Sequence, residues 1–164
     1  MILKSKTSLL GLILLILYFL QYFLKIEWNW LLNLQQGQMF RRWSGLALAI
    51  LIAFQWVLTF TRVIPKLRKY SVKMNTIHKW IGAISPIVFY IHSINLGYGY
   101  LLLLTYIFFA NALMGYINLD VIKSTNETLF KGWMIFHVAF SMIITIVMFF
   151  HICLLYTSPS PRDA

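Results

Sequence analysis

Five long apolar runs constrain this chain more than any other feature of its sequence. They lie near 8–26, 44–64, 76–95, 99–119 and 133–152. A helix needs roughly 20 apolar residues to span the hydrocarbon core of a bilayer, and each run is close to that length. Backbone polar groups cannot stay unpaired in lipid, so segments of this kind cross it as helices. The runs therefore predict an all-α fold, a polytopic membrane helical bundle.

The composition agrees with a membrane protein and excludes a water-soluble domain of this length. Of the 164 residues, 60% are hydrophobic and 11% are charged, and the mean hydropathy is +0.77. A soluble domain could not bury so much apolar surface. The first run is long and lacks a small-residue cleavage site, so we expect a retained helix and not a secretory signal. No Gly-, Ser- or Pro-rich linker interrupts 1–152, which predicts a single domain.

Basic residues are concentrated between the second and third runs, and they account for much of the formal net charge of +10. The cluster consists of Arg62, Lys66, Arg68, Lys69, Lys73 and Lys79. Cytoplasmic connections of membrane proteins carry an excess of Lys and Arg. We therefore expect the lipid bilayer, and no nucleic acid, as the partner of these charges. The N-terminus would then be cytoplasmic, in a protein of the bacterial inner (cell) membrane. Lys25, Arg41 and Arg42 go against this bias, because they fall in the predicted first external loop, but the larger cluster outweighs them.

The four histidines form two pairs, each fourteen residues apart inside an apolar run. His78 and His92 belong to the third run, and His137 and His151 to the fifth. On a helix, fourteen residues return a side chain to within about 40° of its starting direction and raise it by about 21 Å. Each pair therefore lies on one helix face, with one member toward each side of the membrane. The third and fifth runs cross in the same direction, so His78 should face His137, and His92 should face His151.

Histidine within a membrane span is costly and usually functional. Two helices with such faces could clamp one planar metal porphyrin near each leaflet, since imidazole is an axial ligand of haem iron. Ligands about 21 Å apart on one helix cannot share a zinc ion. The pattern predicts two bis-histidine haem b groups, with iron as the metal. For a single histidine, a proton relay or a satisfied buried side chain is the alternative.

Small and basic residues near the histidines extend the predicted site. Gly82 and Ser141 each follow the first histidine of a pair by four residues and would leave room for a flat macrocycle. Ordinary packing of small residues between membrane helices is the other explanation. Arg62 and Lys79 are predicted counter-ions for haem propionates, with interfacial charge as the alternative.

The end of the chain differs in character from the apolar runs. The stretch CLLYTSPSPRD at 153–163 resembles the in-frame translation of a transposon-type sequencing adapter. We expect 153–164 to derive from such an adapter and the native sequence to continue differently after about Ile152. Cys153, the only cysteine, would then say nothing about redox compartment. An ordinary polar tail is the alternative.

The histidine motifs HKWIGAISPIVFYIH (78–92) and HVAFSMIITIVMFFH (137–151) resemble those of the ferric reductase-like transmembrane domain. Ferric-chelate reductases, NADPH oxidases and the haem subunit of the bacterial methionine sulfoxide reductase system share this domain. The resemblance covers about 8–152 and implies six helices, of which five are present here. It implies two haems between the third and fifth helices of an oxidoreductase membrane subunit. It also implies a cytoplasmic flavoprotein partner, with FAD or FMN on a following domain or a separate subunit.

The expected function is electron transfer from a cytoplasmic flavin or quinol, through two stacked bis-histidine haems, to an acceptor on the outer side. A cytochrome b561-type quinol or ascorbate shuttle is the first alternative, because it also uses paired histidines on membrane helices. A haem-free proton-coupled transporter with histidine relays is the second. Such a transporter would need acidic partners at membrane depth, whereas Glu27, Asp120 and Glu127 lie at or beyond span ends.

Overall fold

The computed structural model describes residues 5–117 and 127–157, and these residues form helices without any β-strand. The helices are α1 (Lys6–Phe23), α2 (Asn29–Gln36), α3 (Gln38–Gln55), α4 (Val57–Val63), the 3₁₀ helix η2 (Pro65–Tyr70), α5 (Ser71–His92), α6 (Tyr100–Tyr116) and α8 (Glu127–Thr157). A helix lies over every predicted apolar run. The prediction of an all-α fold is confirmed.

Three helical segments are long and apolar enough to cross a membrane: Lys6–Phe23, Gln38–Val63 and Glu127–Leu155. The apolar helix α6 is shorter, and α5 has 22 residues with several polar ones in its first half. Many large apolar side chains are exposed, and only 11% of the most apolar part of α8 is buried. Apolar surface of this extent is typical of contact with lipid. These features fit a membrane protein, and the count of five spans stays a prediction.

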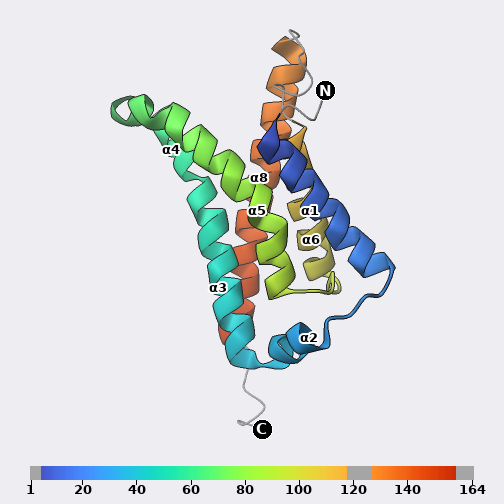
Figure 1. Ribbon diagram of the computed structural model, residues 1–164. Coiled ribbons are helices and arrows are strands. Elements are labelled where there is room, and N and C mark those ends of the chain that lie inside the picture. The colour runs from blue at the N-terminus through green and yellow to red at the C-terminus, as the bar shows by residue number, and fades with distance from the viewer. Residues whose placement is uncertain (1–4, 118–126, 158–164) are drawn as a thin grey trace.

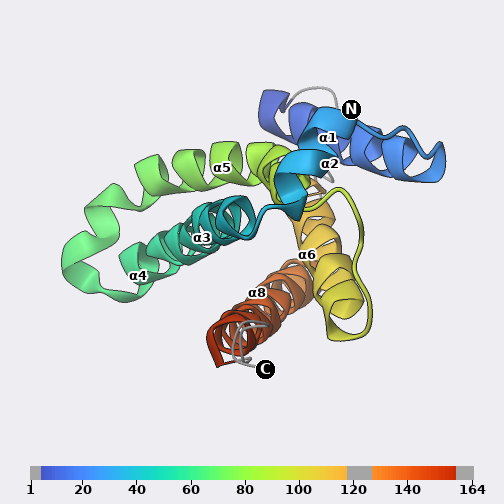
Figure 2. The ribbon, with the colours of Figure 1, turned by 90° about the horizontal axis from the view of Figure 1, so that it is seen from below.

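The helices form a bundle in which α5 is central. It packs against α1, α3 and α6, while α6 lies between α1 and α8 (Figures 1 and 2). The helices α5 and α8 run in the same direction (Figure 1). The beginnings of both helices therefore lie at one end of the bundle, and the ends of both at the other.

Two helix boundaries differ from the predicted runs. The run 44–64 begins earlier, at Gln38, and is divided at Trp56, whose N–H donates to the Ala53 carbonyl at 3.1 Å in the tighter 3₁₀ pattern. α8 begins at Glu127 instead of 133. There Glu127 pairs with Lys131 at 3.4 Å, one turn later, and an acidic side chain is favourable in a first helical turn.

The segment predicted to be adapter-derived, 153–164, lies partly within the described residues. Its first part, up to Thr157, continues α8 without a break. The remainder, 158–164, lies outside the described residues. So does the greater part of the connection 120–132, for which Lys123 and Lys131 predict a cytoplasmic position. The origin of the segment stays a prediction.

Pro86 lies inside α5 without ending the helix. It is fully buried, and because it has no N–H, the Gly82 carbonyl loses its helical partner. Ser85 Oγ at 2.8 Å and Tyr116 Oη at 2.9 Å donate to that carbonyl instead. Tyr116 belongs to α6, and its ring packs so closely on α1 that a methyl group on Gly11 would overlap it. One tyrosine thus joins three helices.

The short helix α2 lies where the sequence predicts an external loop, and it covers the end of α5. The Gln35 side-chain amide donates to the carbonyls of Tyr90 at 2.9 Å and Ile91 at 3.0 Å. Its oxygen accepts from the N–H of Ile94 at 3.2 Å. The last carbonyls of a helix have no partner within it. Gln35 therefore caps the last turn of α5, the turn that ends at His92.

Candidate functional site

A cavity of about 520 Å³ lies between α3, α4, α5, α6 and α8, with the start of α1 also in its lining. This volume is within the range of about 300–1,000 Å³ that ligand pockets usually have. Its lining contains the predicted site residues Arg62, His78, Lys79, Gly82, His137 and Ser141. The structure thus brings together six of the eight residues predicted for the site. The other two, His92 and His151, lie at the far end of α5 and α8.

His78 and His137, the inner pair, face each other across this cavity. Their ring centres are 6.1 Å apart, with an angle of 79° between the planes. An iron ion with an imidazole nitrogen about 2 Å away on each side would hold two ring centres about 6 Å apart. Among the described residues, neither buried Nδ1 atom has a hydrogen-bond partner. Since buried polar atoms are rarely left unpaired, the inner pair fits a group that binds between two imidazoles.

Packing against Trp133 and α6 holds the His137 ring in place. Trp133, one turn earlier in α8, stacks on it with ring centres 5.6 Å apart and planes within 1° of parallel. The Trp133 indole donates to the Met114 carbonyl of α6 at 2.9 Å. A methyl group on Gly115 of α6 would lie 3.6 Å from Cε1 of the imidazole. His137 therefore enters the cavity in a defined orientation.

Two amide side chains that the sequence analysis missed also line the cavity, Gln55 and Asn111. The Asn111 amide donates to Ser141 Oγ at 3.0 Å, and Ser141 donates to the carbonyl of His137 at 2.8 Å. Both amide oxygens are buried and lack a hydrogen-bond partner within the described ranges. Their presence inside apolar runs is the signal that could have found them, because polar groups at membrane depth are usually functional.

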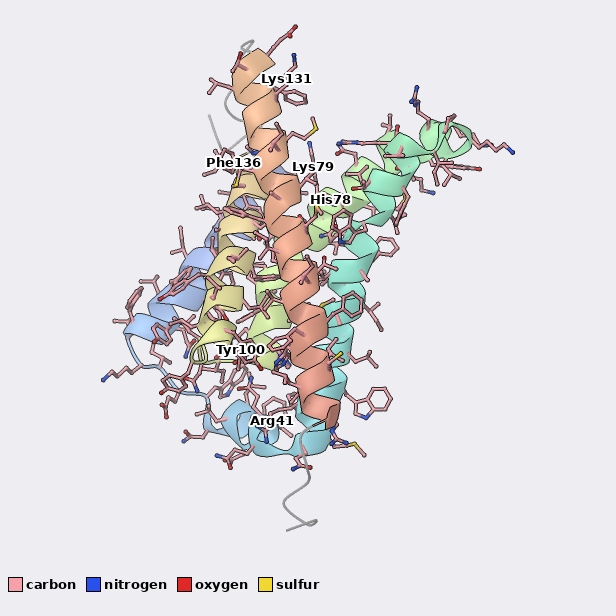
Figure 3. The ribbon with its side chains drawn as sticks, turned by 180° about the vertical axis from the view of Figure 1, so that it is seen from behind. Arg41, His78, Lys79, Tyr100, Lys131 and Phe136 are labelled. Carbon is pink, nitrogen blue, oxygen red and sulfur yellow. The ribbon has the colours of Figure 1, made fainter. Side chains whose placement is uncertain are left out.

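Basic side chains gather at the end of the cavity nearest the start of α5. We call the segment 62–79, with its six Lys and Arg residues, the basic hairpin. The basic hairpin leans away from α8. Its last two residues, His78 and Lys79, lie between the rest of the hairpin and α8 (Figure 3). Arg62 donates to Asn75 Oδ1 at 3.2 Å. Of the side chains known to line the cavity, none is acidic. This end therefore suits the carboxylates of a ligand.

His92 and His151, the outer pair, lie at the other end of the same two helices. They are close enough to interact electrostatically. Each Nδ1 atom meets a hydroxyl group: Ser44 Oγ lies 3.1 Å from that of His92, and Tyr100 Oη lies 3.2 Å from that of His151. Figure 3 shows Tyr100 far from His78 along the bundle. Metal-bound histidines commonly bond their second nitrogen in this way.

The helix faces between the histidines point into the bundle. Their side chains Ser85, Phe89, Ile144 and Met148 are buried. In the part of the chain that the structure describes, no three His, Cys, Asp or Glu side chains gather around one point. A metal ion at either pair would therefore need ligands other than a third side chain of these four types.

Comparison with protein-family models, curated proteins and solved structures gives no match to this chain. The resemblance to the ferric reductase-like domain therefore stays a prediction from the two histidine motifs.

Proposed function

We propose that this protein carries electrons across a membrane on two b-type haems, as the haem subunit of an oxidoreductase. The observation that carries the proposal is the meeting of His78 and His137 across a cavity, with His92 and His151 near each other at the opposite end. A helix rise of about 21 Å separates the two pairs. Haem iron supplies the electron chemistry by changing its oxidation state, while the protein sets ligation, burial and spacing.

In this proposal each pair of imidazoles would hold one haem iron. Gly82 and Ser141 add little bulk beside the inner pair, while Arg62 and Lys79 would bind the propionates. Charge-assisted hydrogen bonds from Arg to carboxylate are strong and directional, which suits Arg62 to this role. The apolar residues around each pair would limit the access of water to the iron and so help to set its potential.

The proposed topology has five spans, or six in a longer chain, with the N-terminus and the basic hairpin in the cytoplasm of a bacterium. The charge distribution supports it, because six Lys and Arg residues lie on the hairpin between α4 and α5. Electrons would come from a flavin on another domain or subunit, or from a quinol. They would leave to an acceptor outside. A b561-type shuttle fits the same histidines.

A histidine-relay transporter is the second candidate function. The unpaired amide oxygens of Gln55 and Asn111 favour it, since they could bind water or a cation in the cavity. The absence of bound haem would distinguish this function from electron transfer.

The first test is haem content. The full chain, produced in a haem-replete host and purified in detergent, should bind about two haems b because each of its two histidine pairs supplies two axial ligands. Pyridine haemochrome analysis gives the stoichiometry, and spectra before and after dithionite reduction give the spin state, which should be low-spin. A haem content near zero would overturn the proposal. A content near one would show that one of the two histidine pairs binds no haem.

A further inference from the structure

We infer that Ser44 and Gly45 of α3 are positioning residues that hold His92 as the tautomer with a proton on Nδ1 and a lone pair on Nε2. The inference rests on the proposed function for its purpose, since a neutral imidazole binds iron through its lone pair. The tautomer itself follows from contacts between α3 and α5.

The Ser44 hydroxyl proton already has an acceptor in its own helix. Ser44 Oγ lies 2.8 Å from the carbonyl oxygen of Phe40 and 3.3 Å from that of Arg41. A hydroxyl group has one proton to donate and two lone pairs that accept. Toward His92 Nδ1, at 3.1 Å, the Ser44 oxygen must therefore accept. The proton of this bond belongs to the imidazole, and Nε2 is left with its lone pair.

Gly45 provides the space that this hydrogen bond requires. A Cβ atom at this position would lie 3.0 Å from Cε1 of His92 and 3.5 Å from its Nδ1. Any larger side chain would push the imidazole away from α3 and lengthen the bond to Ser44. The two adjacent residues thus act together, one through its oxygen and the other through its lack of a side chain.

The other three histidines are held differently. Neither Nδ1 atom of the inner pair has a hydrogen-bond partner in the described part of the chain. His151 meets Tyr100 Oη at 3.2 Å, and this hydroxyl group can donate or accept. At His92, by contrast, the contact with Ser44 places the proton on Nδ1. The tautomer of this one outer histidine is therefore set by the packing of α3 on α5.

The test is ¹⁵N NMR of the imidazoles in the haem-free full chain, at a pH where they are neutral. The chain has four histidines, so single substitutions assign each signal. We expect the Nδ1 shift of His92 to be that of a protonated nitrogen and the Nε2 shift that of a free one. Ser44→Ala should move both shifts toward the average of the two tautomers, and Ser44→Thr, which keeps the hydroxyl group, should restore them.

Matched controls separate positioning from general damage. Thr76→Ala removes an exposed hydroxyl that bonds to a carbonyl one turn back, as Ser44 does, and should leave the His92 signals unchanged. Gly45→Ala should disturb them, whereas Gly132→Ala, where an added methyl meets no atom within 4 Å, should not. A proton on Nε2 in the wild type, or unchanged shifts in Ser44→Ala, would overturn the inference.

Haem titration separates this inference from the proposed function. Loss of an outer-shell partner typically lowers metal affinity about 10- to 100-fold, so Ser44→Ala should weaken haem binding at the outer site by that order and spare the inner site. Wild-type protein that binds no haem would overturn the proposed function, while the NMR result would still decide the tautomer. Equal weakening at both sites would contradict a positioning role at His92.

Discussion

The depth of each histidine in the bundle determines which other histidine it can face. The centres of the His78 and His137 rings lie 6.1 Å apart, and His92 lies within electrostatic range of His151. A crossed pair would have to join side chains about 21 Å apart in depth, which the usual helix tilt of about 20° does not allow. The two members of each pair should therefore be equivalent in their effect on the haems.

We predict that alanine at either member of a pair removes the same haem. His92→Ala and His151→Ala should each lower the haem content from about two to about one per chain and abolish the same step in a potentiometric titration. His78→Ala and His137→Ala should abolish the other step. If His92→Ala instead matched His137→Ala, the parallel arrangement of α5 and α8 would be contradicted.

At the scale of elements, α5 contains a proline and remains one helix because α6 supplies the missing donor. Tyr116→Phe should destabilise the protein by about 0.6 kcal/mol, the average for hydrogen bonds between membrane helices, and by at most about 1.7 kcal/mol. In a Pro86→Ala background the backbone N–H of residue 86 returns to the Gly82 carbonyl, so the same change should cost less than half as much. Unfolding in mixed detergent micelles measures this double-mutant cycle.

The control for this cycle is Tyr106→Phe, a change on the exposed face of the same helix. It should have little effect in either background, because exposed substitutions away from specific contacts usually change stability by less than about 0.5 kcal/mol. An equal cost of Tyr116→Phe with and without Pro86 would show that the tyrosine acts through packing and not through the carbonyl.

At the scale of the whole molecule, the basic hairpin and the connection between α5 and α6 should lie on opposite sides of the membrane. Cys153 is the only cysteine, so Cys153→Ser gives a cysteine-free background. Tyr98→Cys, at a position with 92% of its surface exposed, should react with an impermeant maleimide in intact cells. Lys69→Cys should react only after the membrane is opened, because Lys-rich connections stay in the cytoplasm. Labelling of both from the same side would show that α5 does not span.

The sequence by itself determined the helical class, the approximate helix positions and the face of each histidine pair. These follow from local rules, since a backbone in lipid must satisfy its own hydrogen bonds and helical periodicity fixes which residues share a face. The positions of Gly82 and Ser141 in the cavity lining follow from the same periodicity, because each lies one turn from a histidine that enters it.

Only the tertiary structure decided which groups on other helices meet those faces. Gln35 caps α5, Ser44 and Tyr100 bond the outer histidines, and Asn111 bonds Ser141. Periodicity carries no information about the rotation and depth of one helix relative to another, because packing of whole surfaces sets these. A serine in an apolar run looks the same in sequence whether it faces lipid or an imidazole. Its role at His92 appears only once α3 is packed against α5.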